Sequence, residues 1–343
     1  MKPLVSILIP AYNAEAWISD TICSALAQTW EPKEIIVVDD GSTDRTLAIA
    51  RQFESEHLHV VTHKNQGASA TRNKAFSLSQ GDYIQYLDAD DLMGPDKIAR
   101  QVEALGPSPN KRTLLSGSWG HFMYRYYRTK FIPSALWCDL SPVEWLTRKM
   151  KLNLYMQTAS WLVSRELAEA AGPWDTRLLG DDDGEYFCRV LLASDGVHFV
   201  PEAKVYYRTS GTGSLSYIGH SDRKKVAQLC SMELHVRYIR SLEDSPRVRD
   251  ACVTYLQNWL MYFYPDRPDL MRQVEELAAS LGGKLKPPAL SWKYAWIAAL
   301  SGRRLARRAQ VVLPQIKWSL IRSWDKAMFQ LEGGKLTGSL LKS

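Results

Sequence analysis

The chain has 343 residues, of which 45% are hydrophobic, and a formal net charge of +6. This length suits one large domain or two ordinary ones, and the apolar share is enough to bury a sizeable core. Five widely spaced cysteines without a C-x-x-C pair argue against a disulfide framework or a zinc knuckle and fit a reducing compartment, and no run reaches the ~18 apolar residues of a membrane span. We therefore expect a cytoplasmic protein, and we interpret the short apolar run at the start as a strand, since it lacks the features of a secretory signal.

The first hundred residues predict alternating strands and helices. Strands are expected at 6–9, 34–38, 60–61 and 83–87, where apolar or β-branched runs end at turn residues. Between and after them, apolar residues recur at helical spacing over 18–26 and 98–105, and Ser42 or Thr43 can cap a helix that ends at Phe53. Strands that are apolar on both faces and joined by helices predict an α/β fold with a mainly parallel sheet flanked by helices.

The rest of the chain changes character twice. Residues 106–110 have the composition of a surface connection, and 113–210 mix helical and strand patterns with many Trp and Tyr residues. From residue 222 onward the pattern is helical, with interruptions at the prolines of 265–268 and 287–288. We therefore expect one domain over 1–220 and a helical C-terminal region over 221–343.

Acidic residues follow two of the predicted strands. Asp39 and Asp40 come after the second strand, and the run from Asp88 to Asp91 comes after the fourth. Ligands of parallel sheets bind beyond the carboxyl ends of the strands, so both clusters mark a candidate site. The D-x-D spacing places two carboxylates on one side of an extended segment, where one can hold Mg²⁺ or Mn²⁺. The alternative is that Asp90 and Asp91 only cap the helix that follows.

A third acidic cluster, Asp181-Asp182-Asp183, precedes a helical pattern. Acidic residues are ordinary in the first turn of a helix, because the helix dipole favours negative charge there. The functional alternative is a general base, since a crowded carboxylate can have its pKa raised toward neutrality. Spacing alone favours the first interpretation.

Four motifs in order resemble those of the family 2 inverting glycosyltransferases. They are VSILIPAYN from residue 5, EIIVVDDGSTD from residue 34, NQG with ATRN between 65 and 73, and GDYIQYLDADD from residue 81. A looser match continues to about residue 215 through the GPWD segment that contains Trp174 and through the acidic pair. The resemblance implies a GT-A, Rossmann-like fold, with a nucleotide-sugar-binding half over 1–105 and an acceptor-binding half over 106–220.

The resemblance implies donor-binding roles for several matching positions. Pro10, Ala11 and Tyr12 would belong to the nucleotide-sugar site, the last two beside the base. Asp39 would accept a hydrogen bond from the base, and a carboxylate acceptor there suits a pyrimidine N–H. Arg72 would lie over the nucleotide, near the diphosphate.

The resemblance also implies the reacting positions. Asp88 would contact the ribose or a metal-bound water, and Asp90 would bind the metal. Asp183 would be the general base, with Asp182 as its neighbour in a pair whose register is open by one residue. Trp174 would face the acceptor, although a tryptophan there can equally be a packing residue.

These roles predict transfer of a single sugar, a hexose or N-acetylhexosamine, from a UDP-sugar to a glycan or lipid-linked acceptor, with inversion. The Q-x-x-R-W motif of processive synthases is absent, and so is a histidine that many relatives carry in a segment like 205–212. A nucleotidyltransferase and a non-catalytic nucleotide-sugar-binding protein remain as alternatives, disfavoured by the missing Gly-rich phosphate loop and by the intact acids. We expect no nucleic-acid partner.

The segment 291–322 mixes aromatic and aliphatic residues with clustered cations. The cations include Arg303, Arg304, Arg307 and Arg308. This composition predicts docking on an anionic membrane surface, and hence a peripheral position on the inner face of the cytoplasmic membrane. The alternative is that these helices pack on the catalytic domain and only the arginines face solvent.

Overall fold

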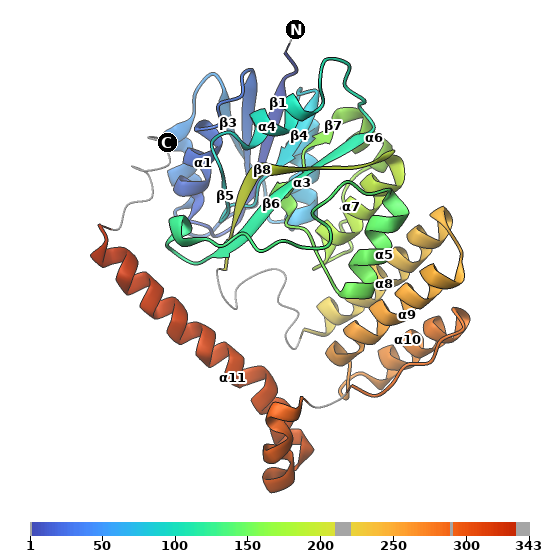
Figure 1. Ribbon diagram of the computed structural model, residues 1–343. Helices are drawn as coiled ribbons and strands as arrows, with labels where there is room; N and C mark the ends of the chain where they lie inside the picture. Colours follow the sequence, from blue (N-terminus) through green and yellow to red (C-terminus); the bar gives the residue numbers. More distant parts are fainter. Residues whose placement is uncertain (1, 210–220, 289–290, 334–343) are drawn as a thin grey trace.

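The computed structural model describes residues 2–209, 221–288 and 291–333 (Figure 1). Its main sheet has five strands in the order β3-β2-β1-β4-β7. Four are parallel, and the edge strand β7 (Val163–Ser164) runs antiparallel to β4. The parallel strands are β1 (Val5–Ala11), β2 (Lys33–Asp39), β3 (Leu58–Thr62) and β4 (Tyr83–Tyr86). The predicted mainly parallel sheet is therefore confirmed.

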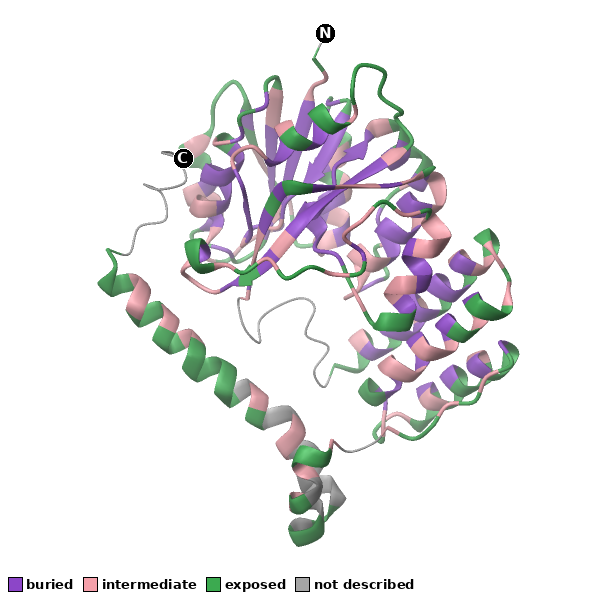
Figure 2. Ribbon diagram, viewed as in Figure 1, coloured by how far each residue is buried: buried purple, intermediate pink, exposed green. Residues whose placement is uncertain are grey.

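Helices cover both faces of this sheet, as the pattern predicted. Along β1, Ile7 and Ile9 join the core under α1 (Ile18–Leu26) and α4 (Lys97–Ala104), while Leu8 joins the core on the opposite face. The opposite face is covered by α3 (Ala68–Leu78), α5 (Pro142–Leu152), α6 (Arg165–Ala171) and α7 (Asp182–Ala193). Figure 2 shows the buried strands between these helices.

A second, three-stranded sheet has the order β5-β8-β6. Its strands are β5 (Leu92–Met93), β6 (Thr113–Phe122) and β8 (Gly196–Arg208), with β6 and β8 parallel. Because β5 follows the Asp88–Asp91 turn and pairs with the last residues of β8, the end of β8 lies beside that turn. The second sheet thus brings residues 113–208 to the acidic edge of the first.

Three C-terminal helices pack on the α/β domain. They are α8 (Asp222–Leu242), α9 (Pro246–Trp259) and α10 (Pro268–Ser280). Their buried residues, among them Met232, Cys252 and Leu270, share one apolar cluster with α5, α6 and α7. The predicted boundary near residue 220 lies outside the described residues, so the division into two regions stays a prediction.

The last helix, α11 (Ala295–Leu331), runs along the outside of the molecule (Figure 1). It bends at Gly302, which has a non-helical φ of 83°, and contains Pro314. Within the described residues, no helix is both long and apolar enough to cross a bilayer.

One local expectation and one alternative interpretation were wrong. The helix α2 (Thr46–Ala50) is not capped by Ser42 or Thr43, since Asp44 Oδ1 accepts the hydrogen bond from the Thr46 backbone N–H at 2.9 Å. Asp90 and Asp91 do not cap a helix, because β5 follows them and α4 begins only at Lys97. Both acids therefore lie in the turn between β4 and β5.

Candidate functional site

The loops that follow β1 and β2 are joined by hydrogen bonds. Asn13 adopts a left-handed φ of 47°, its Oδ1 accepts from the Thr43 backbone N–H at 2.8 Å, and its own N–H donates to Ser42 Oγ at 3.0 Å. The Asp40 N–H donates to the carbonyl of Ala11 at 2.8 Å. This network places the predicted donor-binding segment Pro10-Ala11-Tyr12 beside Asp39, with the Tyr12 side chain half exposed.

The two carboxylates after β2 have different environments. Asp40 accepts the backbone N–H groups of Gln66 and Gly67, at 2.8 and 2.9 Å, and so orders the loop that leads into α3. Asp39 is buried; its Oδ2 accepts from the Thr62 hydroxyl at 2.9 Å, while its Oδ1 has no hydrogen-bond partner among the described residues. Asp39 Oδ1 is therefore an unsatisfied acceptor at the end of β2. The sequence did not indicate this loop-ordering role of Asp40.

Arg72, on α3, connects two acidic clusters that are distant in sequence. One guanidinium nitrogen donates to Asp88 Oδ1 at 2.8 Å and the other to Asp182 Oδ2 at 2.7 Å. Burial disfavours the charged guanidinium, but the negative charges of Asp182 and Asp88 outweigh this effect and raise the pKa of Arg72. The buried cation therefore fixes the end of β4 against the start of α7. Because these two carboxylates engage its guanidinium, a place for Arg72 near a diphosphate stays a prediction.

The Trp174 ring packs against the Arg72 guanidinium. Trp174 is only 2% exposed, and its ring stacks on the Tyr186 ring with centroids 4.1 Å apart. The Arg72 guanidinium lies over the Trp174 ring, 4.5 Å from the ring centroid. The Asn73 side chain holds the Trp174 backbone through two hydrogen bonds of 2.8 and 2.9 Å. We expected Trp174 to face the acceptor, but it is a packing residue in this structure, because Tyr186 and Arg72 cover its ring.

The acidic pair at the start of α7 consists of two unlike carboxylates. Asp182 is ion-paired with Arg72, whereas Asp183 accepts from the Thr158 hydroxyl at 3.3 Å and from the Gly184 N–H at 2.8 Å. Burial, followed by the negative charges of Asp182 and Asp181, raises the pKa of Asp183 to about 7. The helix does begin with acids, as the simpler interpretation held, and one of them can also exchange a proton near neutral pH.

The three acids after β4 divide in a similar way. Asp91 is fully buried, where it accepts hydrogen bonds from the Arg208 backbone N–H at 2.7 Å and from the Gln157 side chain. Burial, and then the charges of Asp90 and Asp88, raises the pKa of Asp91 well above its usual range. Asp88 and Asp90 lie nearer the surface. Arg208, whose Nε donates to the Asp90 carbonyl at 2.6 Å, was not recognised in the sequence, and neither was Gln157.

A divalent cation would need ligands besides the protein at this edge. The part of the chain that the structure describes contains no group of three or more His, Cys, Asp or Glu side chains arranged to hold a metal. The carboxylates of Asp88 and Asp90 supply the oxygen donors that Mg²⁺ and Mn²⁺ prefer. They fit a cation that is held by one or two carboxylates and completed by substrate phosphates and water.

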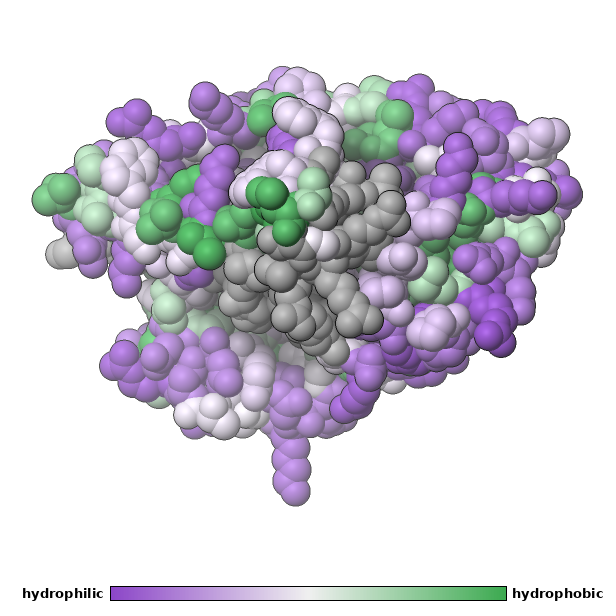
Figure 3. Space-filling model, turned by 90° about the horizontal axis from the view of Figure 1, so that it is seen from below, coloured by the Kyte–Doolittle hydropathy of each residue, from purple (hydrophilic) through white to green (hydrophobic). Residues whose placement is uncertain are grey.

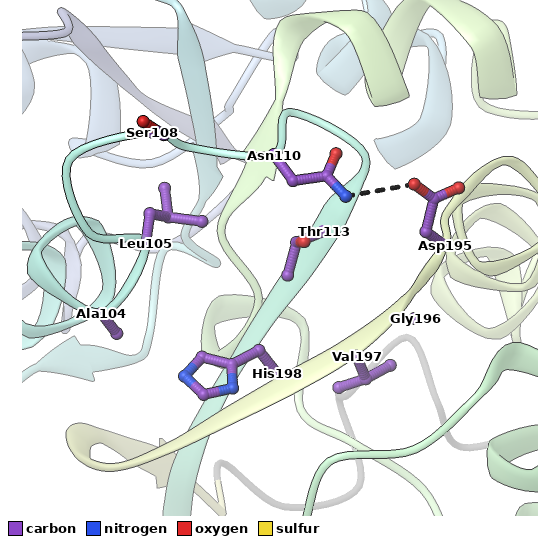
Figure 4. Close-up of a pocket in the computed structure, with 9 residues that line it drawn as sticks. All are labelled: Ala104, Leu105, Ser108, Asn110, Thr113, Asp195, Gly196, Val197 and His198. Atoms are coloured by element: carbon purple, nitrogen blue, oxygen red, sulfur yellow. Dashed lines mark hydrogen bonds between the residues drawn. The ribbon is translucent and has the colours of Figure 1, made fainter.

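A hollow of about 440 Å³ lies elsewhere on the molecule (Figure 4). It is lined by residues at the start of β6 and β8, such as Thr113 and His198, with Asn110 bonded to Asp195 at its rim. At a rise of about 3.3 Å per residue, His198 is roughly 30 Å from Arg208, which lies beside Asp90 at the other end of β8. This hollow is therefore separate from the acidic site.

The ion pairs of Arg72 give a prediction about stability. Arg72→Met leaves the carboxylates of Asp88 and Asp182 without their cation, and we expect the free energy of unfolding to fall by about 3 kcal/mol in urea titrations. The control is Arg177→Met, which breaks a 2.6 Å pair with Asp175 on a side chain that is 71% exposed, and which should change stability little. Equal losses in the two variants would contradict the structural role of Arg72.

Comparison with known proteins shows a family resemblance over part of the chain. Residues 6–132 match the model described as Glycosyl transferase family 2. The putative teichuronic acid biosynthesis glycosyltransferase TuaG of Bacillus subtilis is 47% identical over 105 residues, which are 30% of this chain and 42% of TuaG. An uncharacterized glycosyltransferase of Rickettsia felis is 38% identical over 263 residues, which are 75% of this chain and 43% of that protein. The match thus spans less than half the length of either relative.

A solved structure shares the fold. TarS 1–349 of S. aureus, in complex with UDP-GlcNAc, aligns with a TM-score of 0.54 and 18% identity, covering 82% of this chain and 93% of the TarS chain. That likeness identifies the GT-A arrangement of a mainly parallel sheet flanked by helices. Over residues 6–132 the chain is similar to glycosyl transferase family 2, and it shares the fold of TarS.

Proposed function

We propose that this protein transfers a single sugar from a UDP-sugar to a hydroxyl group of a cell-surface glycan precursor, with inversion at the anomeric carbon. The observation that carries the proposal is the position of Asp183 at the start of α7, next to Asp182, which is ion-paired with Arg72. Burial and the neighbouring negative charges raise the pKa of Asp183 to about 7. A carboxylate with a pKa near the working pH suits a general base, because it is both ionised and basic enough to accept a proton. The names of relatives support the acceptor class, since they include teichuronic acid biosynthesis and a chondroitin synthase of Escherichia coli.

The donor site is proposed at the ends of β1 and β2. The unsatisfied Oδ1 of Asp39 is suited to accept a hydrogen bond from the N–H of a uracil ring, and Tyr12 borders it with an exposed ring. The crystallisation of TarS with UDP-GlcNAc supports a uridine nucleotide. dTDP-sugars present the same N–H and are the second choice.

Asp90 is proposed to hold Mg²⁺ or Mn²⁺, with Asp88 contacting the ribose or a metal-bound water. When bound, the cation would neutralise charge that develops on the departing diphosphate. Arg72 donates a hydrogen bond to Asp88, and Arg208 donates one to the backbone carbonyl of Asp90. The protein thus contributes oriented carboxylates rather than a complete metal cage.

The proposed reaction is one displacement. The acceptor hydroxyl attacks the anomeric carbon while Asp183 takes its proton, and the diphosphate leaves from the opposite face with the electron pair of the broken bond. An α-linked donor then gives a β-linked product. Asp182 cannot share this task easily, because its charge is engaged by Arg72 at 2.7 Å.

A donor and metal panel tests the proposed function. UDP release should occur with at least one UDP-sugar, depend on Mg²⁺ or Mn²⁺ and stop in EDTA. In Asp90→Asn, which keeps the size of the side chain but loses its charge, turnover should fall by orders of magnitude with folding intact. Full turnover of Asp90→Asn in EDTA would refute the metal assignment. Tighter binding of GDP than UDP in calorimetry would refute the assignment of uracil as the nucleotide base.

A pH profile tests the base. The active form of Asp183 is the carboxylate, so kcat/KM should fall as the pH drops through about 7. Asp183→Asn should lower transfer by ~10²–10⁴-fold and leave UDP binding close to normal. Asp182→Asn removes a charge that raises the pKa of Asp183, so its acid limb should move to lower pH. If Asp182→Asn is inactive and Asp183→Asn is active, the general base is Asp182.

We further propose that α11 docks on an anionic membrane surface. Large apolar side chains on and before it face solvent, including Trp292, which is 81% exposed, and Trp296, Leu300, Trp318 and Leu320. Seen from below, apolar side chains gather on this side of the molecule (Figure 3). Rings of this kind favour the headgroup boundary, and neighbouring cations favour anionic lipid. The side chains of Arg303, Arg304, Arg307 and Arg308 lie outside the described residues, so their part stays a prediction.

Liposome flotation tests this docking. Full-length protein should float with phosphatidylglycerol vesicles and much less with neutral ones, and the triple variant Trp292→Ser, Trp296→Ser, Trp318→Ser should lose flotation yet keep activity on a soluble acceptor. Ile132→Ser is the control, since Ile132 is 74% exposed but lies on the α/β domain. Flotation that is unchanged in the triple variant, or absent in the natural chain, would exclude the membrane role.

A further inference from the structure

Four rings form a cluster near the proposed base, and the site described above does not use them. Trp119 and His121 lie on β6, Tyr207 lies on β8, and Tyr155 lies between α5 and the turn at Thr158. The Trp119 ring centroid is 4.9 Å from that of Tyr155 and 6.0 Å from that of Tyr207, and the His121 and Tyr207 centroids are 5.0 Å apart. We call Trp119, His121, Tyr155 and Tyr207 the ring cluster.

Two residues of the ring cluster are close in sequence to residues that contact the acidic site. Tyr155 precedes Thr158, whose hydroxyl donates to Asp183 at 3.3 Å, and Tyr207 precedes Arg208, whose N–H donates to Asp91 at 2.7 Å. Burial, and then the negative charge of Asp183, raises the pKa of Tyr155. Burial, followed by the negative charges of Asp91 and Asp183, raises the pKa of Tyr207. Both phenols therefore lie within electrostatic reach of the proposed base.

Part of the ring cluster is open to solvent. Tyr155 is 48% exposed and His121 is exposed, although aromatic side chains normally gain from complete burial. Polar atoms lie at the rim, where His121 Nε2 and the Tyr155 hydroxyl are 3.0 Å apart and His121 Nδ1 and the Thr209 hydroxyl are 3.3 Å apart. The surface thus combines open ring faces with hydrogen-bonding groups at the edge.

This combination matches the chemistry of a pyranose ring. A pyranose has faces of C–H groups, which pack on an aromatic ring, and an edge of hydroxyls, which need hydrogen-bond partners. A nucleotide would instead need cations for its phosphates, and the ring cluster offers none. The predicted nucleotide contacts Tyr12 and Asp39 belong to the other sheet, at the ends of β1 and β2.

We propose that the ring cluster is the acceptor subsite, in which Tyr155 stacks on a pyranose ring of the acceptor glycan and holds a hydroxyl of that ring toward Asp183. The proposal rests on the proposed function for the role of Asp183, but the binding of a sugar at the ring cluster can be measured without turnover. It gives the acceptor-binding role that we expected of Trp174 to residues contributed by β6, β8 and the segment before Thr158.

The test compares two tyrosines with similar surroundings. Tyr155 is 48% exposed and packs on Trp119 with centroids 4.9 Å apart and planes at 41°; Tyr262 is 43% exposed and packs on Trp259 with centroids 5.1 Å apart and planes at 33°. Tyr262 lies in the C-terminal helical region, between α9 and α10, and contributes to no proposed site. Tyr155→Ala and Tyr262→Ala therefore remove equivalent exposed rings, one inside the proposed subsite and one outside it.

Binding is measured by saturation-transfer NMR on the full chain, with methyl β-glycosides of glucose, galactose, glucuronic acid and N-acetylglucosamine as probes and no donor present. We expect saturation of the pyranose ring protons for at least one probe, about tenfold weaker binding in Tyr155→Ala, and near-normal binding in Tyr155→Phe and Tyr262→Ala. UDP affinity should be the same in all four proteins, which shows that the nucleotide half stays folded.

The outcomes separate this inference from the proposed function. No binding of any probe by the natural chain, unchanged binding in Tyr155→Ala, or an equal loss in Tyr262→Ala each overturns the acceptor subsite. If UDP-sugar KM rises in Tyr155→Ala while probe binding is unchanged, the ring cluster serves the donor sugar and the proposal is wrong. Absence of UDP release from every UDP-sugar would refute the transferase activity but leave the probe-binding result valid.

Discussion

A buried guanidinium needs negative partners, and Arg72 finds two of them in parts of the chain that are 94 residues apart, Asp88 and Asp182. A cation without these carboxylates would bear the full cost of its desolvation, so the end of β4 and the start of α7 must meet at α3. The same contact places Asp182 beside Asp183 and so contributes to the raised pKa of the proposed base, while the positive charge of Arg72 limits that rise. Assembly of the site and tuning of its acid–base chemistry therefore depend on one side chain.

Each acidic cluster combines a structural carboxylate with one that we propose for substrate. Asp40 orders the loop before α3 and Asp182 pairs with Arg72, while their neighbours Asp39 and Asp183 keep an unsatisfied oxygen or a pKa near neutrality. After β4 the structural member is Asp91, which is buried against Arg208 and Gln157. Adjacent residues of an extended or turning backbone point in different directions, so a pair can bind protein on one side and ligand on the other.

The helical C-terminal region contacts residues of α7 on both sides of Asp183 in the sequence. Asp181, at the start of α7, accepts a hydrogen bond from the Ser231 hydroxyl of α8 at 2.5 Å and lies 3.6 Å from His235. One turn further along α7, Glu185 is buried and accepts from the Tyr238 hydroxyl at 2.8 Å. A region in which we recognised no motif thus contributes to the position and charge environment of Asp183.

The sequence by itself determined the parallel sheet, the acidic clusters at the strand ends and the motifs of the family, because strand periodicity and turn residues act over a few neighbouring positions. It could not tell that Asp91 is buried while Asp90 lies nearer the surface, or whether Trp174 packs in the core or faces an acceptor. Burial depends on which distant segment covers a side chain. The double ion pair of Arg72, the contact of Arg208 with Asp90, and the ring cluster, drawn from three separate segments, were decided only by tertiary packing. Their partners lie 16 to 118 residues apart, where no local pattern records that they meet.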